Sequence, residues 1–283
     1  MLSKIEIRQQ FGQQSNWKGG LVVTRDLIFL GMALGIAYYW GQHWWLTILL
    51  IWFIGMIQFA MGESLLHEAS HGNLFKTKKM NVWVGNLIAY AILTTLDEWR
   101  TEHQTHHGYL LSEQDHLTQD YIDYRLYKGI HPFITWILQP LLGWVGFHWL
   151  RSELGGLFKH KGVLLFYAIL LVFCGLTNSF SFLFWYWIIP LIWAYSSILY
   201  WSEITDHYLA KAATRSNTSF FWNFMFHNGG YHWVHHEYPY IPWYLLKEAD
   251  ELLSPTDSPM DRTKGWWEMY QIMLEDYNSK HLV

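Results

Sequence analysis

Four apolar runs, arranged as two closely spaced pairs, constrain this chain more than any other feature. Residues 21–40 and 44–66 form the first pair, and residues 162–176 and 182–204 form the second. A transmembrane helix needs about 20 mostly apolar residues. Only 15% of the residues are charged, well below the roughly 25% of soluble domains. The sequence therefore predicts an all-α integral membrane protein whose four transmembrane helices form two hairpins.

The positive charges indicate which side of the membrane each segment occupies. The chain has 19 Lys and Arg residues, and none lies in the two hairpin turns at residues 41–43 and 175–181. Cytoplasmic segments are enriched in Lys and Arg. We expect both termini in the cytoplasm, in a multi-pass protein of a membrane such as the bacterial inner membrane. The net charge of −4 gives no indication of nucleic-acid binding.

Two shorter apolar segments connect the hairpins. Residues 82–96 are too short for a full span, and we interpret them as an interfacial or re-entrant segment. Residues 132–150 contain two prolines and a histidine, and we expect them to form an amphipathic segment on the membrane surface. On this interpretation the polar segments, including every histidine cluster, form a cytoplasmic helical cap.

Sixteen histidines are present, and half of them fall in three clusters with helical spacing. Positions i, i+3 and i+4 share one helix face. The second apolar run has no helix breaker before Gly72, so its helix is expected to carry the first cluster out of the membrane. His207 follows the last span and is a further candidate. The clusters comprise His67 and His71, then His103, His106 and His107, and finally His232, His235 and His236.

Eight or nine imidazoles are too many for one metal ion and suit two. Nitrogen ligands alone do not distinguish iron, zinc and copper. Each ligating imidazole normally donates its second N–H to a nearby acceptor. The candidates for this supporting role are Glu63, Glu68, Glu102, Asp115, His116, Glu203, Asp206, His227, Asn228 and Glu237. We interpret the isolated histidines as interfacial residues, namely His43, His131, His148, His160 and His281.

The segments HEASHG, HQTHHG and HWVHHEYP, in this order, resemble the three histidine boxes of the membrane fatty acid desaturase superfamily. The resemblance covers residues 20–250. It implies that the eight box histidines bind two iron ions. Members of the family often have one more histidine shortly after the last span, between an acidic residue and a tyrosine. Asp206-His207-Tyr208 resembles that segment, which implies that His207 is a ninth ligand. Glu203 stands where some relatives have Asn, so the correspondence is weaker there.

The resemblance further implies an O2-dependent enzyme that desaturates a fatty-acyl or lipid-like chain within the membrane. The single cysteine, Cys174, cannot hold an iron–sulfur cluster, so electrons must come from an external donor such as ferredoxin or cytochrome b5. We expect residues 1–283 to form one desaturase-like domain.

Three alternatives remain open from the sequence. A hydroxylase or ketolase of the same superfamily would have the same boxes. His67-Glu68-Ala69-Ser70-His71 also matches the HExxH pattern of zinc metalloproteases, with Asp97 as a possible third ligand. A metal transporter would place its site near the bilayer midplane, whereas no histidine falls inside a predicted span.

Overall fold

The computed structural model describes residues 3–254 and 261–281. The predicted all-α class is confirmed, because helices and one pair of very short strands are the regular elements of the described residues. These are β1 (Ser216–Asn217) and β2 (Arg262–Thr263), which pair in parallel.

The first predicted hairpin is formed by α2 (Asn16–Trp40) and a continuous rod that begins at Trp44. The rod consists of α3 (Trp44–Phe59), the π-helical turn η1 (Ala60–Leu65) and α4 (Leu66–His71). It ends at Gly72, whose φ of 77° lies in the left-handed region that glycine adopts without strain. The prediction that this helix carries the first histidine cluster as far as Gly72 is confirmed.

The second hairpin turns at Asn178, which has a left-handed φ of 52°. Before the turn lies α10 (Lys161–Thr177), and after it a second rod of 28 residues, Phe180–His207. This rod comprises α11 (Phe180–Leu183), η5 (Phe184–Ile188), η6 (Pro190–Tyr195) and α12 (Ser196–His207).

Three helices among the described residues are long and apolar enough to cross a membrane: Asn16–Trp40, Trp44–His71 and Phe180–His207. The remaining predicted span, residues 162–176, coincides with α10, which has 17 residues and is bent by 102° from the preceding helical segment Trp144–Lys159. The structure therefore supports three spans, or four if this bent pair counts as one.

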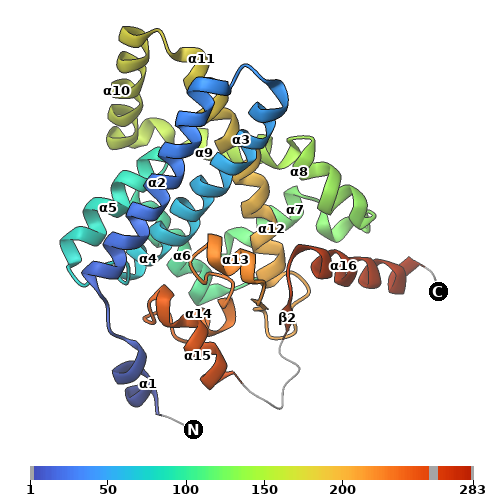
Figure 1. Cartoon of the computed structure of the whole chain (residues 1–283). Coiled ribbons are helices and arrows are strands. Elements are labelled where there is room, and N and C mark those ends of the chain that lie inside the picture. The colour runs from blue at the N-terminus through green and yellow to red at the C-terminus, as the bar shows by residue number, and fades with distance from the viewer. Residues whose placement is uncertain (1–2, 255–260, 282–283) are drawn as a thin grey trace.

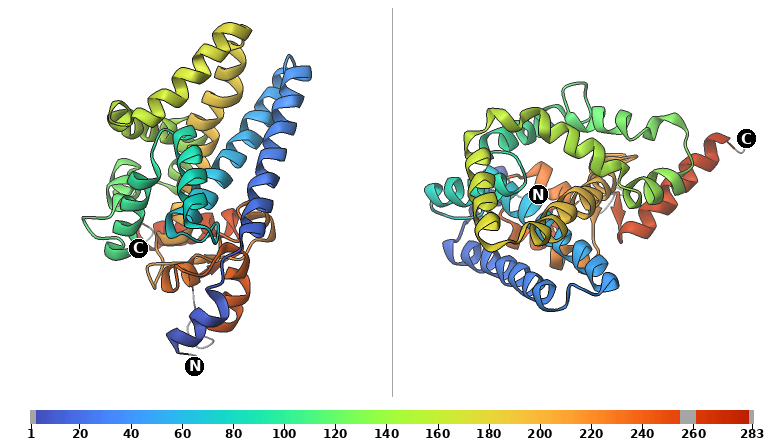
Figure 2. Two further views of the ribbon diagram at one scale, coloured as in Figure 1. Left: turned by 90° about the vertical axis from the view of Figure 1, so that its left-hand side faces the viewer. Right: turned by 90° about the horizontal axis from the view of Figure 1, so that it is seen from above.

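The two 28-residue rods pack closely because small residues meet at their crossing. A Cβ atom added to Gly55 would lie 2.3 Å from the Cβ of Ala194, so only glycine permits this approach. Figure 2 shows the blue and yellow hairpins rising from the part of the molecule that contains the C-terminal helices. The crossing brings the end of α4 and the end of α12 to the same region.

The segment between the hairpins forms short helices. The apolar residues 82–96 fall mainly in α5, a helix too short to span a membrane, which agrees with the interfacial interpretation. Residues 132–150 form several short helices, and the chain breaks at Gly143, where φ is 78°; their position on the membrane surface stays a prediction. The elements are α5 (Lys78–Ala91), α6 (Leu96–Tyr109), α7 (His116–Asp123), η2 (Leu126–Lys128), η3 (Phe133–Leu138), α8 (Gln139–Leu141), α9 (Trp144–Gly156) and η4 (Leu157–Lys159).

The remaining elements lie at the end of the molecule away from both hairpin turns (Figure 1). They comprise α1 (Lys4–Phe11), α13 (Phe220–Met225), α14 (His232–Glu237), η7 (Trp243–Leu245), α15 (Leu246–Leu253) and α16 (Trp266–His281).

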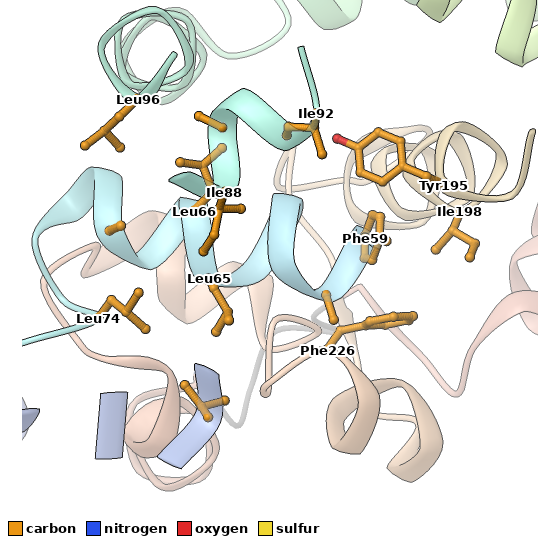
Figure 3. Packing of buried hydrophobic residues seen from close by; sticks show 14 of the residues in the cluster. Phe59, Leu65, Leu66, Leu74, Ile88, Ile92, Leu96, Tyr195, Ile198 and Phe226 are labelled. Atoms are coloured by element: carbon orange, nitrogen blue, oxygen red, sulfur yellow. The ribbon is translucent and has the colours of Figure 1, made fainter. Parts of the chain in front are cut away.

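A buried cluster joins the rods to the surrounding helices (Figure 3). Leu65 and Leu66 have no exposed surface, and His67 follows them directly. Shortening either leucine to alanine is expected to cost about 2–5 kcal/mol. This packing fixes the rotation of the helix from which the first histidine cluster projects. The other labelled members are Phe59, Leu74, Ile88, Ile92, Leu96, Tyr195, Ile198 and Phe226.

Candidate metal centre

All nine predicted ligands come together, and they divide into two groups. The ring nitrogens within each group lie within 4.8 Å of one another. We name the groups by size. The five-histidine group contains His67, His71, His103, His107 and His235, and the four-histidine group contains His106, His207, His232 and His236.

Helix geometry explains the division within each box. Residues four positions apart are offset by about 40° around the helix axis, whereas residues three apart are offset by about 60° in the opposite direction. His103 and His107 therefore share the five-histidine group, while His106 joins the other. The third box divides in the opposite sense: His232 and His236 join the four-histidine group and His235 joins the five-histidine group.

The ring nitrogens converge more tightly than hydrogen bonding alone can explain. The Nε2 atom of His235 lies 2.8 Å from that of His67 and 3.0 Å from that of His107. The His103 Nε2 atom likewise lies 3.0 Å from those of His71 and His107. Each Nε2 carries either one proton or one lone pair, so it cannot satisfy two such neighbours. Lone pairs directed at a common metal ion fit this arrangement.

The four-histidine group shows the same convergence. The Nε2 atom of His232 lies 2.9 Å from that of His207 and 3.0 Å from that of His236. Both groups therefore offer what a divalent transition metal requires, namely several neutral imidazoles pointing at one place.

Burial favours the neutral form of the five imidazoles His103, His107, His232, His235 and His236. Desolvation is the main cause that lowers the pKa of His107 to about 3, and the neighbouring His71 and His106 lower it further. Desolvation and neighbouring histidines also hold the pKa of His103, His232, His235 and His236 well below the usual range. A neutral imidazole has a lone pair available for a metal ion.

Acceptors on the far side of the rings orient the four-histidine group. The His106 Nδ1–H donates to Asp115, whose two carboxylate oxygens are 3.1 and 3.2 Å away. The His207 Nδ1–H donates to the carbonyl oxygen of Ala213 at 2.9 Å. Asp206 Oδ2 lies 4.0 Å from His232 Nδ1. Asp115 therefore lies where we expected a supporting carboxylate, and Asp206 lies close to one ring.

Several predicted supporting residues lie elsewhere, which corrects the sequence interpretation. Glu68 points away from the histidines, and its carboxylate accepts the backbone N–H of Trp243 at 3.0 Å. The side-chain amide of Asn228 donates to the Trp243 carbonyl oxygen. Glu237 is exposed. A helix turn places neighbouring side chains on different faces, so proximity in sequence was a poor guide.

His227 was also wrongly assigned a supporting role. Its Nε2 atom lies 2.8 Å from Asp26 Oδ2 and 3.1 Å from a guanidinium nitrogen of Arg25. Arg25 also donates to the carbonyl oxygens of Phe224 and Met225. These contacts anchor the segment before α14 to α2. Asp26 lies 201 positions from His227, and no sequence pattern connected the two.

Glu203 belongs to a separate polar cluster. His116 Nε2 lies 3.9 Å from Glu203 and its Nδ1 lies 3.8 Å from Glu102. These carboxylates raise the pKa of His116 to about 10, although burial opposes the shift. Asp120 belongs to the same cluster, and burial followed by repulsion from Glu203 raises its pKa to about 8. The helical spacing of His116 and Asp120 could have identified this pair.

Two more contacts were not anticipated. Glu63 accepts a 2.5 Å hydrogen bond from the Tyr195 hydroxyl and not from a histidine. The ring of Trp99 lies 4.7 Å from that of His103 and 5.5 Å from that of His67, measured between centroids. The five isolated histidines belong to neither group in the described part of the chain.

A cavity of about 350 Å³ lies beside both groups. His67 and His103 of the five-histidine group reach its wall, as do His106, His207 and His232 of the four-histidine group. A molecule in this cavity would therefore lie next to both candidate metal positions.

The zinc-protease alternative is incompatible with this geometry. The candidate base, Glu68, is buried against the Trp243 backbone. The candidate third ligand, Asp97, is 89% exposed and pairs with Arg100. Neither the general base nor the third zinc ligand of the protease pattern is therefore in place.

An all-helical chain with two converging histidine groups at the ends of membrane-length helices defines a class of membrane metalloprotein. Residues 42–264 match the model of the fatty acid desaturase family. The chain belongs to this family.

Curated relatives include the chloroplastic omega-3 fatty acid desaturase of Ricinus communis, with 26% identity over 84% of this chain and 60% of the relative. The temperature-sensitive sn-2 acyl-lipid omega-3 desaturase (ferredoxin) of Arabidopsis thaliana is also 26% identical, over 84% of this chain and 63% of its own length. An endoplasmic-reticulum omega-3 desaturase of Nicotiana tabacum is 25% identical over 82% and 71%, respectively. The chain thus spans less than two thirds of the first two relatives.

Proposed function

We propose that this protein is an O2-dependent di-iron oxidoreductase that desaturates a fatty-acyl or lipid-like chain. The observation that carries the proposal is the division of nine imidazoles into two converging groups beside one cavity. Family membership favours iron over the other metals that bind imidazole. The five-histidine group would hold one ion and the four-histidine group the other.

Two bound iron ions would supply the activation of O2 that removes hydrogen from an unactivated C–H bond. In the overall reaction two hydrogens leave neighbouring carbons, which become doubly bonded. O2 takes up these hydrogens together with two electrons and two protons and leaves as two molecules of water. The electrons come from an external carrier such as ferredoxin or cytochrome b5. One relative has ferredoxin in its name.

The residues of this chain prepare the site for that chemistry. Asp115 and the Ala213 carbonyl hold Nδ1–H of their histidines, which leaves each Nε2 free to bind metal. The buried cluster beneath His67 keeps its helix in place. Aromatic side chains such as Trp99 and Tyr195 line the cavity, limit the access of water and contact an aliphatic chain.

We propose a single domain with four spans and a cytoplasmic helical cap. The hairpin turns lack Lys and Arg, and α1 and α16 lie at the opposite end of the molecule (Figure 1). Both observations are consistent with two hairpins inserted from the cytoplasmic side of a membrane such as the bacterial inner membrane. The histidine groups then lie just outside the lipid core, where a chain can enter from the bilayer.

The decisive experiment compares His235→Ala with His43→Ala. His235 contacts two other histidines of its group, whereas His43 is exposed at a hairpin turn. We expect His235→Ala to lose iron and all product, and His43→Ala to keep both. Lipid profiles of the expression host identify the product. Loss of two hydrogens supports desaturation, and gain of one oxygen atom would indicate the hydroxylase or ketolase alternative. Full iron content in His235→Ala would refute the metal site.

A further inference from the structure

Helix α13 presents an apolar surface that the described part of the chain leaves uncovered. Phe220, Phe221 and Phe224 are 84%, 57% and 51% exposed, respectively. The rings of Phe220 and Phe224 stack with their centroids 6.1 Å apart, so the surface is continuous. Residues 216–236, which contain α13 and the third histidine box, include no Lys, Arg, Asp or Glu. An exposed patch of this kind marks an interaction surface.

Arg25 joins α13 to the membrane-length helix α2. Its guanidinium donates to the carbonyl oxygens of Phe224 and Met225 at 2.7 and 2.8 Å. Its guanidinium carbon also lies 5.7 Å from the ring centroid of Phe224 and 5.7 Å from that of Phe29, one turn further along α2. Only 22% of the apolar stretch of α2 is buried within the protein. The aromatic surface of α13 therefore continues the surface that α2 offers to lipid.

The position of Arg25 along α2 indicates the depth of α13. Trp17 and Trp40 are exposed at the two ends of this helix, and exposed tryptophans are enriched at both membrane interfaces. At a rise of 1.5 Å per residue they lie about 34 Å apart, close to the roughly 30 Å of a hydrocarbon core. Arg25 lies about 12 Å inward from Trp17 on the same scale. The α13 rings beside Arg25 are therefore level with acyl chains.

The end of α13 is also suited to an environment without water. The last four carbonyl oxygens of a helix have no partner within the helix, and at membrane depth such groups must find donors in the protein. In α13 all four have one. Arg25 provides two of these bonds, and backbone N–H groups 2.8 and 2.9 Å away provide the others. The four carbonyls belong to Trp222, Asn223, Phe224 and Met225.

We propose that α13 inserts into the leaflet on the side of the histidine groups, with its three exposed phenylalanines in contact with lipid acyl chains. The region after the last span is then attached to the bilayer beside α2. This attachment fixes the depth of the segment that leads to His232 and the third histidine box. The inference requires that α2 crosses the membrane, and it is independent of the metal centre and of the reaction.

The test places one fluorescent probe on α13 in the full-length protein. Cys174→Ala removes the single cysteine, and Phe220→Cys then provides one site for a thiol-reactive fluorophore. The labelled protein is reconstituted in nanodiscs of phosphatidylcholine. Two quenchers are compared, namely phosphatidylcholine with a nitroxide on its acyl chain and iodide in the buffer. The nitroxide reports contact with lipid, and iodide reports contact with water.

Two matched probes define the limits in the same Cys174→Ala background. Ile28→Cys lies on α2 and Leu252→Cys on α15, and the replaced side chains are similarly exposed, at 53% and 55%. Helix α15 lies at the end of the molecule away from both hairpin turns (Figure 1). We expect the Phe220 probe to be quenched by the nitroxide as strongly as the Ile28 probe. Its quenching by iodide should be several-fold weaker than that of the Leu252 probe.

A second position keeps the test informative. If Phe220→Cys fails to fold, the probe on Phe221→Cys should give the same result, because both side chains belong to one exposed surface. Quenching by iodide as strong as at Leu252, with none by the nitroxide, would place α13 in water and refute the inference. Protection from both quenchers would refute it as well, because protein would then cover the surface. Energy transfer between copies labelled with donor and acceptor would identify that protein as a second copy of this chain.

Discussion

Replacement of Asp115 by Asn should weaken metal binding and, to a smaller extent than replacement by Ala, the fold. The carboxylate is 2% exposed and accepts the His106 Nδ1–H through both oxygens. It also accepts the backbone N–H of Leu111 at 2.7 Å and that of Leu117 at 3.3 Å, which caps α7. Asn caps helices as well as Asp does, but its amide has one acceptor oxygen and no charge. The substitution thus keeps the cap, weakens the support of His106 and leaves the Leu111 N–H without its acceptor.

The magnitude follows from these contacts. Loss of the acceptor behind a metal-binding histidine typically lowers metal affinity about 10–100-fold, or about 1.4–2.7 kcal/mol. Only the four-histidine group contains His106, so it should lose its metal first. Both variants leave the Leu111 N–H unsatisfied, at about 1–3 kcal/mol, and Asp115→Ala also removes the cap, worth about 1 kcal/mol. The alanine variant should therefore be less stable by about 2–4 kcal/mol even without metal.

The assay equilibrates each variant with graded chelator and measures iron per chain by mass spectrometry, together with thermal unfolding of the metal-free protein. Glu113→Gln is the matched control, because Glu113 is exposed two residues away. Release of both ions from Asp115→Asn at the same chelator concentration, or of neither, would refute the assignment of His106 to a separate group.

Three further predictions concern the backbone, the role of Glu68 and pH. Gly72→Ala should destabilise the protein by about 1–2 kcal/mol, because φ is 77° there; nothing lies near the added Cβ, so the cost is backbone strain alone. Gly20→Ala, in open space inside α2, should instead stabilise it by about 0.5–1 kcal/mol. Equal shifts of the two unfolding temperatures would contradict this prediction. Glu68→Gln should keep iron and activity, since the amide oxygen can still accept the Trp243 N–H, whereas complete inactivation would revive a catalytic Glu68. The pKa of His107 is lowered from 6.5 to about 3, so protons bind the unfolded chain preferentially. The metal-free protein should be fully stabilised above pH 6.5 and lose about 1.4 kcal/mol per pH unit for this residue as pH falls toward 3. The unfolding temperature of metal-free His107→Gln should therefore fall less steeply between pH 6.5 and pH 3 than that of the unmodified protein. An unchanged slope would contradict this prediction.

The tertiary structure decided which residues act together. His235 meets His67 across 168 positions of sequence and His107 across 128, and His227 meets Asp26 rather than a metal-binding histidine. Such partners depend on how the two 28-residue rods cross at Gly55 and Ala194. The cavity beside the histidine groups is likewise built from residues of several helices, and no local pattern indicates their proximity.

The sequence by itself determined the features that depend on local chemistry. Apolar runs specified the long helices, Gly72 and Asn178 marked where two of them end, and the i, i+3, i+4 spacing placed the histidines on shared helix turns. These patterns involve residues within about one turn of each other. The division of nine histidines into groups of five and four, and the orientation of Glu68 away from them, depend on packing between distant segments. Only the folded chain decides those, because side-chain packing and not spacing determines which helix faces meet.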